Sequence, residues 1–312
     1  MEVRTGIARR DVSGGIGPKS ADLDIYYEDM GNPDDPAVLL VMGLGAQLLL
    51  WRDGFCRKLI DQGLRVIRYD NRDVGLSGKL HGQRADGSQP VRMARSFLGL
   101  RSNAVYTLDD MADDAAALLD HVRVDRAHVV GASMGGMIAQ VFAARHGHRT
   151  KTLAVIFSSN NQRFLPPPGP QQLLAVIKGP PPDSPREVIV ENAVRVGKLN
   201  GSPRYPTPEE QIRAEAIEGY ERCYYPVGIA RQFDAILGSG SLLRYDRQIT
   251  APTVVIHGKA DKLMRPTGGR AVANAIAGAR LVLYDGMGHE LPQQLWDDII
   301  GELKTNFAEA PS

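Results

Sequence analysis

A short glycine-rich turn around Ser133 constrains this sequence more than any other stretch does. An apolar run from Ala127 to Val130 precedes it, and apolar residues recur at helical spacing after it. The spacing Gly131-x-Ser133-x-Gly135 is that of a nucleophile elbow, a sharp strand-to-helix turn that exposes a serine hydroxyl. Side chains at the two flanking positions would collide with neighbouring elements, which explains the glycines. The sequence therefore predicts a buried strand, a strained turn at Ser133 and a helix whose positive end faces the hydroxyl.

Apolar runs and helical patterns alternate along most of the chain. Strands are expected over 37–42, 65–69, 127–130, 152–157, 252–257 and 280–284, and an antiparallel edge strand over 23–28. Helices are expected near 51–61, from 107 onwards, after 133, near 271–277 and over 293–307. Continuous apolar runs are typical of strands that are buried on both faces of a parallel sheet. The alternation predicts an α/β fold with a mostly parallel, doubly wound sheet, in which ligand sites form at the carboxyl ends of the strands.

The alternation stops between residues 160 and 245. Proline-rich stretches at 166–170 and 180–182 punctuate this region, and Thr207-Pro208-Glu209-Glu210 has the signature of a helix start. We expect a mainly helical cap over residues 160–245. It would be inserted into a core domain made of residues 1–159 and 246–312.

Three further features follow expected strands and therefore fall at the same edge of the sheet as Ser133. They are the loop at Gly43 and Leu44, the carboxylate of Asp261 and the imidazole of His289. A serine hydroxyl needs a base to take its proton, and that base is usually a histidine held in one tautomer by a carboxylate. Ser133, Asp261 and His289 follow one another in an order known for such triads. We predict that these three residues are catalytic.

Negative charge that develops on a carbonyl oxygen during ester hydrolysis is stabilised by backbone N–H groups. The N–H of Met134, directly after the serine, is one predicted donor. The N–H of Leu44, in the loop after the 37–42 strand, is the best candidate for the other. Leu44 and Met134 are therefore the predicted oxyanion hole.

Other polar residues are given structural interpretations. His257 ends an expected strand, and we interpret it as a core or supporting histidine. The acidic residues between Asp109 and Asp114 are expected to form a solvated helix face. His146 and His148 are spaced like a weak metal pair, but we do not predict a metal site there or elsewhere.

Taken together, these stretches resemble the α/β-hydrolases of the serine esterase and lipase type over about residues 20–308. The resemblance is closest to the actinobacterial group that includes the aclacinomycin methylesterase-like enzymes. The stretches that carry it are 41–46, 68–73, 131–136 and 286–289. The resemblance implies an α/β-hydrolase fold with a cap, a Ser133–His289–Asp261 triad and no cofactor.

Two positions depart from the family's pattern. Met42-Gly43 stands where many relatives have His-Gly, and Asp73 stands where they often have glycine. Because the N–H of Leu44 does the chemical work, we expect the oxyanion hole to survive the first change. We take the turn at Asp73 to be structural.

Composition excludes several other classes of protein. A chain of 312 residues with 43% hydrophobic and 23% charged residues can bury a large core and is neither disordered nor collagen-like. A formal net charge of +1 argues against a nucleic-acid binder. Two distant cysteines, Cys56 and Cys223, indicate a reducing compartment. The first twenty residues contain no apolar signal core and no long apolar run occurs, so we expect a cytoplasmic protein.

The predicted function is that of a serine hydrolase that cleaves carboxylic esters through an acyl-enzyme on Ser133. Small-molecule esters of short to medium acyl chains are the expected substrates, with lipid esters as a variant. Thioesterase, lactonase and phospholipase activities with the same triad stay open, as does a ligand receptor of low turnover. The basic and apolar stretch from Arg92 to Arg101 is expected to be a rim over a pocket, and peripheral membrane contact is the alternative.

Overall fold

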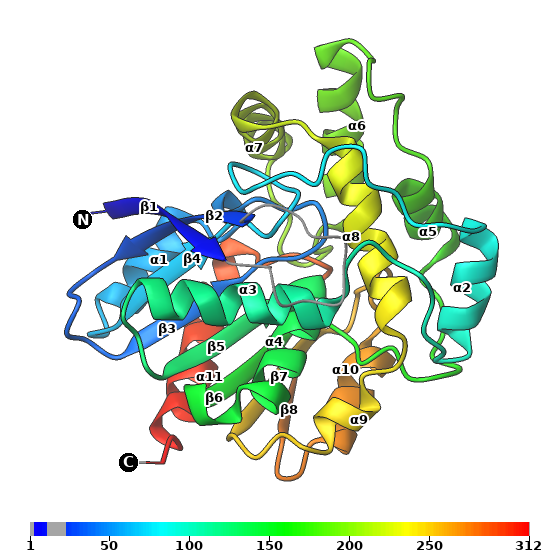
Figure 1. The fold of residues 1–312 in the computed structure, drawn as a ribbon. Helices are drawn as coiled ribbons and strands as arrows, with labels where there is room; N and C mark the ends of the chain where they lie inside the picture. The colour runs from blue at the N-terminus through cyan, green and yellow to red at the C-terminus, as the bar shows by residue number, and fades with distance from the viewer. Residues whose placement is uncertain (1–2, 11–22, 312) are drawn as a thin grey trace.

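The structure, a computed structural model, describes residues 3–10 and 23–311 of the chain. Within these residues, an eight-stranded sheet runs through the molecule in the order β1-β2-β4-β3-β5-β6-β7-β8 (Figure 1). Strands β3 to β8 pair in parallel, whereas β2 pairs antiparallel with both β1 and β4. The strands are β1 (Val3–Arg10), β2 (Leu23–Met30), β3 (Ala37–Val41), β4 (Arg65–Tyr69), β5 (Ala127–Ala132), β6 (Thr150–Ile156), β7 (Thr253–Gly258) and β8 (Arg280–Tyr284).

Helices cover both faces of the sheet, as Figure 1 shows. One face packs against α3 (Leu108–His121), α4 (Met134–Arg145) and α10 (Pro266–Ala275), and the other against α1 (Asp53–Ile60) and α11 (Trp296–Ala308). In β3, Leu39 belongs to the first apolar cluster, while Val38 and Leu40 belong to the second. Successive strand residues point to opposite faces, so both faces need apolar side chains, which explains the continuous runs. The predicted fold class is confirmed.

The prediction of an edge strand over 23–28 is wrong in one respect. β1 lies outside it, with Val3 paired to Met30 and Arg10 to Leu23, so β2 is an interior strand. β1 shows no apolar periodicity because Ala8 is its one buried residue and the others are exposed or half-buried. Charged side chains on such an edge hinder pairing with another chain. Residues 11–22, part of the stretch in which no signal segment was expected, lie outside the described residues.

Between β6 and β7 the chain forms a helical segment, residues 160–245, which we call the insertion. Its helices are α5 (Pro170–Ile177), α6 (Arg186–Asn200), α7 (Glu209–Arg222), α8 (Pro226–Ser239) and, at its end, α9 (Leu243–Asp246). Figure 1 shows α5 to α8 gathered beyond one end of the sheet. A further helix, α2 (Gln89–Phe97), forms within the stretch expected to be an irregular rim, and it has no fully buried residue.

The two ends of the insertion lie at one place. The Leu242 N–H donates to the carbonyl of Asn160 at 2.8 Å, and the Asn160 side-chain amide donates to the Asp246 carboxylate at 2.8 Å. These contacts hold the two ends of the insertion side by side. Of the helices in the described residues, none is long and apolar enough to cross a lipid bilayer.

Candidate active site

Ser133 occupies the turn between β5 and α4 with a φ of 57° and a ψ of −124°. A positive φ is strained for a serine, so the surroundings must hold it in place. A Cβ atom on Gly131 would lie 2.2 Å from the Gly135 carbonyl, and one on Gly135 would lie 2.1 Å from a carbonyl of β3. The Ser133 N–H donates to the Ile156 carbonyl at 3.0 Å. The glycines and this contact produce the sharp turn that the sequence predicts.

The structure brings Ser133, His289 and Asp261 together at the carboxyl ends of β5, β8 and β7. Ser133 Oγ lies 2.9 Å from His289 Nε2, and His289 Nδ1 lies 2.7 Å from Asp261 Oδ2. The side chain of His289 is 9% exposed and that of Asp261 is fully buried. Both distances are those of hydrogen bonds, so a continuous chain of contacts joins the hydroxyl to the carboxylate.

The Asp261 carboxylate is held from several directions. Its Oδ1 accepts from the N–H groups of Leu263 at 2.8 Å and Met264 at 2.9 Å, while Oδ2 faces His289 and lies 3.4 Å from His257 Nε2. Burial alone would raise the pKa of Asp261, but the charge and hydrogen bonds of the two imidazoles outweigh burial and hold it below its ordinary value. The carboxylate is therefore ionised at neutral pH.

His257 supports the site rather than facing the hydroxyl. Its ring is fully buried, and Nε2 lies 2.6 Å from the Met264 carbonyl, so this nitrogen carries the proton. The loop that presents Asp261 to His289 is thereby fixed. An aromatic contact orients the other imidazole, since the ring of Phe157 lies 4.8 Å from that of His289.

The loop after β3 lies against the serine. A Cβ atom on Gly43 would come within 2.9 Å of Ser133 Cβ and 3.3 Å of its Oγ, so only glycine fits there. Leu44 follows directly, and Met134 begins α4. In the part of the chain that the structure describes, neither of these two N–H groups donates to a protein acceptor. Both predicted oxyanion donors therefore have unused hydrogens, one in the residue after Ser133 and the other in the residue after Gly43.

The expectation of a solvated acidic face on α3 is wrong for Asp114. This residue is 1% exposed, and its carboxylate lies 2.6 Å from both Arg72 and Arg10. The two arginines are 42 and 104 residues away, which hides the pairing from any local pattern. Asp113 contacts His146 at 2.9 Å. Among residues 3–10 and 23–311 no group of three or more side chains is arranged to hold a metal ion.

No sequence pattern marked the residues of the insertion that reach this site. The His289 N–H donates to the Asn200 carbonyl at 2.8 Å, and the Gly288 N–H donates to Ser202 Oγ at 2.9 Å. In return, the Ser202 N–H donates to a Glu290 carboxylate oxygen at 2.6 Å. The last residue of α6 and the residues just after that helix therefore hold the loop that carries the imidazole.

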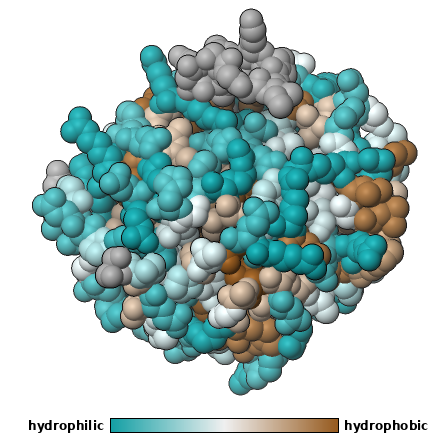
Figure 2. Space-filling model, turned by 60° about the horizontal axis from the view of Figure 1, so that its bottom comes forward, coloured by the Kyte–Doolittle hydropathy of each residue, from teal (hydrophilic) through white to brown (hydrophobic). Residues whose placement is uncertain are grey.

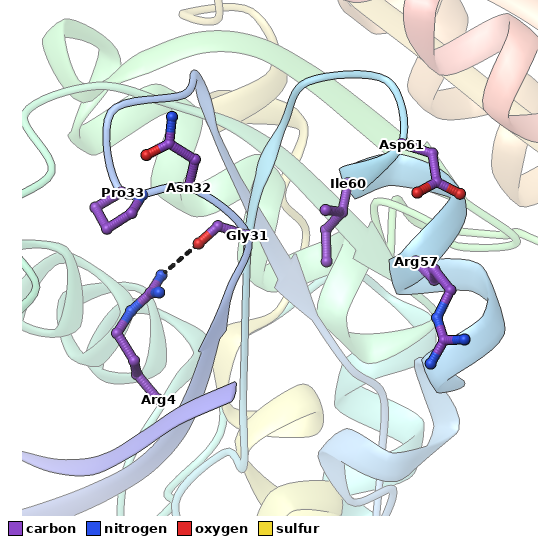
Figure 3. Close-up of a pocket in the computed structure, with 7 residues that line it drawn as sticks. All are labelled: Arg4, Gly31, Asn32, Pro33, Arg57, Ile60 and Asp61. Carbon is purple, nitrogen blue, oxygen red and sulfur yellow. Dashed lines mark hydrogen bonds between the residues drawn. The ribbon is translucent and has the colours of Figure 1, made fainter. Parts of the chain in front are cut away.

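A surface cavity of about 590 Å³ lies away from these residues (Figure 3). Arg4 points toward Gly31 on one side of it and donates to its carbonyl at 2.9 Å, and Arg57 of α1 and Asp61, just after that helix, lie on the other. Gly31 follows β2, whose last residue pairs near the start of β4, so the cavity is at the amino ends of the parallel strands. It plays no part in the candidate site.

Fold and site together define a class of protein. A serine on a strained turn at the carboxyl edge of such a sheet, within hydrogen-bond distance of an imidazole, is typical of hydrolases that act by acyl transfer. The sequence profile of the alpha/beta hydrolase fold family matches residues 36–292, and the chain belongs to this family.

Individual relatives narrow the class. The chain is 28% identical over 299 residues to rhodomycin D methylesterase of Streptomyces peucetius, covering 87% of this chain and 90% of that protein. It is 27% identical over 245 residues to the monoacylglycerol lipase of Mycolicibacterium smegmatis, covering 76% and 77%. The solved 2-hydroxy-6-oxo-6-phenylhexa-2,4-dienoate hydrolase of a Rhodococcus species superposes with a TM-score of 0.72 at 19% identity, covering 98% and 100%. The predicted resemblance to the methylesterase group is confirmed, and the chain is a carboxylic ester hydrolase.

Proposed function

We propose that this hydrolase cleaves small-molecule carboxylic esters through a covalent acyl-enzyme on Ser133. The observation that carries the proposal is the 2.9 Å contact from Ser133 Oγ to His289 Nε2, continued at 2.7 Å to Asp261. Oγ attacks the ester carbonyl while Nε2 takes its proton, and the imidazolium then protonates the departing alcohol. A water molecule, deprotonated by the same imidazole, attacks the acyl-enzyme and releases the acid.

The remaining groups stabilise charge. Asp261 accepts the proton of Nδ1, so that the unprotonated Nε2 of His289 faces the serine and the imidazolium is stabilised when it forms. The N–H groups of Leu44 and Met134 donate to the oxyanion, and loss of one such donor typically costs about 3–4 kcal/mol of transition-state stabilisation. Neither step needs a cofactor.

We propose that the insertion, residues 160–245, acts as a cap on a core made of residues 1–159 and 246–312. Its helix α8 touches the loop after β3, where a Cβ atom on Gly45 would lie 3.1 Å from Ile229. Acyl and alcohol groups would therefore be selected between the insertion and the carboxyl edge of the sheet. Relatives that are a methylesterase and a monoacylglycerol lipase support esters of small alcohols as the substrate class.

Steady-state hydrolysis of p-nitrophenyl esters from acetate to decanoate tests this function. We expect turnover with a preference for short or medium chains, and a loss of at least about 10³-fold in kcat for Ser133→Ala. Ser184→Ala, a serine between α5 and α6, is the matched control and should keep native kcat. Unchanged activity of Ser133→Ala would contradict the proposal, and a single burst without turnover would favour a ligand receptor. Thioester and lactone substrates assayed in parallel separate the remaining alternatives.

A patch of exposed apolar side chains favours lipid esters as a second substrate class. The α2 patch consists of residues that are 46–63% exposed: Val91, Phe97, Leu98, Leu100 and Phe164. Figure 2 shows hydrophobic surface gathered on its right-hand side, the side on which Figure 1 places α2. The Phe97 and Phe164 rings lie 5.8 Å apart, and exposed Arg95 and Arg163 accompany them. Apolar side chains next to arginines suit the surface of an anionic bilayer.

Co-sedimentation with vesicles tests this membrane contact. We expect binding to vesicles that contain phosphatidylglycerol, weaker binding to pure phosphatidylcholine, and loss of binding in the double variant Phe97→Ser with Phe164→Ser. Val188→Ser, an equally exposed change on α6 outside the α2 patch, is the control and should bind like the native protein. Equal binding of all three proteins would rule out the α2 patch as the contact.

A further inference from the structure

Gln232, on the insertion helix α8, is fully buried and joins two loops of the core. Its Oε1 accepts from the Gly45 N–H at 2.8 Å, and its Nε2 donates to the Arg72 carbonyl at 2.7 Å. A flipped amide would place N–H against N–H and oxygen against oxygen, so this orientation is the only one that satisfies both partners. The two contacts span 187 and 160 residues of sequence.

The contact to Gly45 falls in the turn that carries the proposed oxyanion donor. Gly45 has a φ of +66°, and the Ala46 N–H closes the turn on the Gly43 carbonyl at 3.3 Å. The peptide unit that contains the Leu44 N–H and the one that contains the Gly45 N–H are linked through φ and ψ of Leu44 alone. Holding the second unit therefore limits how far the first can rotate away from the serine.

Within residues 3–10 and 23–311, the other side-chain hydrogen bonds at this turn hold its two ends. The Asn71 amide donates to the Met42 carbonyl at 2.7 Å before the turn, and Gln47 accepts from Arg222 at 2.7 Å after it. Between them, two glycines supply no side chain that could anchor the backbone. Gln232 makes the side-chain hydrogen bond at the middle of the turn.

We propose that Gln232 is a positioning residue of the oxyanion hole, through its hydrogen bond to the Gly45 N–H. This inference rests on the proposed function, since it concerns the Leu44 N–H as a donor to the oxyanion. It gives the insertion a part in the chemical step in addition to substrate selection. A donor displaced by about 1 Å can lower the rate by about 100-fold, so a positioning contact of this kind has a measurable effect.

Gln232→Met tests the inference, because methionine has a similar length but no acceptor for the Gly45 N–H. We expect kcat for a p-nitrophenyl ester to fall by about 10- to 100-fold with little change in KM, since a contact that matters in the transition state is weakened. Inhibition by an arylboronic acid, which forms a tetrahedral adduct with the serine, should weaken by a similar factor. If Gln232 had only a structural role, the affinity for the boronic acid would change by the same factor as KM.

Asp234→Ala is the matched control on the same helix. Asp234 contacts Arg92 of α2 at 3.0 Å, and among the described residues no hydrogen bond or ion pair joins it to the turn at residues 43–46. We expect native kcat and native boronic acid affinity in this variant. Equal losses in both variants, or native kcat in Gln232→Met, would overturn the inference.

Hydrogen exchange of the native protein adds a test that needs no folded variant. A peptide that covers residues 43–47 should retain one protected amide, that of Gly45, beyond those bonded within the turn. Exchange of this amide at the rate of an unprotected one would overturn the inference. Ser133→Ala separates the two proposals: native turnover that survives this change refutes the proposed function and the inference together, whereas a failed Gln232→Met prediction refutes the inference alone.

Discussion

The Asp261 carboxylate contacts two imidazoles. Asp261→Asn removes its charge and keeps the size of the side chain. In Asp261→Asn the amide Nδ2 would face His289 Nδ1 and donate to it, so Nε2 would carry the proton and could not accept one from Ser133. We expect kcat for a p-nitrophenyl ester to fall by about 10⁴-fold, as for the same change in a serine protease triad. Circular dichroism should show native secondary structure. A loss of less than tenfold would contradict the assigned role.

Asp73 stands in a turn where the resemblance to the α/β-hydrolases predicts glycine. Its φ is 67°, a conformation in which glycine is unstrained, yet its carboxylate accepts from Arg231 of α8 at 2.7 Å and 2.8 Å. Both side chains are buried. The aspartate is therefore kept in a strained conformation by a buried ion pair, which supports the structural role expected from the sequence.

For Asp73→Gly we expect lower stability despite the relief of backbone strain. Loss of the carboxylate leaves the Arg231 guanidinium buried without its partner, which costs about 3–5 kcal/mol, whereas the strain relieved is about 1–3 kcal/mol. Urea unfolding measures the net change. The double variant Asp73→Gly with Arg231→Met should recover part of the loss, and a more stable single variant would contradict this account.

At the scale of elements, the sequence predicts those whose signal is local. Strands buried on both faces show as apolar runs, and the Ser133 turn shows in its own glycines. β1 gave no signal because its partner strand, not an apolar face, holds it in place. α2 was missed because none of its residues is fully buried.

The same distinction holds within the candidate site. Ser133, Asp261 and His289 each follow a recognisable strand, so their convergence could be predicted from chain order. Gln232 and Ser202 could not, because a buried glutamine or serine in a helical segment looks like any other until its partner is known. Those partners lie 187 and 86 residues away.

The packing of β5 against α11 makes stability depend on pH. His128 of β5 is buried, and its ring lies 4.2 Å from that of Phe307. Burial, followed by the charges of Lys151 and Arg126, lowers the pKa of His128 from 6.5 to about 4. As the pH falls below 6.5, His128 therefore binds a proton in the unfolded chain, whereas in the folded chain it does so only near pH 4.

We expect the free energy of unfolding to decline as the pH falls from 6.5 towards 4, by up to about 1.4 kcal/mol per pH unit from this group. Urea unfolding at several pH values measures the slope. His128→Gln should flatten it, while His148→Gln, a change at an exposed position after α4, should leave it unchanged. Equal slopes in all three proteins would show that His128 does not titrate as described.

At the scale of the whole molecule, the helices of the insertion differ in how many of their residues are buried. α8 has eight buried residues, among them Gln232 and Arg231, whereas α7 has none. Local opening is easiest where few side chains are buried. α8 should therefore behave as part of the core, and α7 should open independently of it.

Hydrogen exchange with mass spectrometry tests this division. Peptides from residues 226–239 should exchange as slowly as peptides from β5, through global unfolding, while peptides from 209–222 should exchange through openings of smaller free energy. Increasing urea should accelerate the first set much more than the second. Similar rates and urea dependence for the two helices would contradict the division.

Because the two ends of the insertion lie close together, the substrate specificity of such an enzyme could change by exchange of this segment. Because Asn160 and Leu242 are one hydrogen bond apart, a different helical segment could be exchanged here without altering the sheet. The recipient would still need a partner for the Gly45 N–H and another for the Gly288 N–H. Proteins with a grafted segment should therefore fold more often than they are active. A glutamine facing the Gly45 N–H and a serine facing the Gly288 N–H are the first residues to restore.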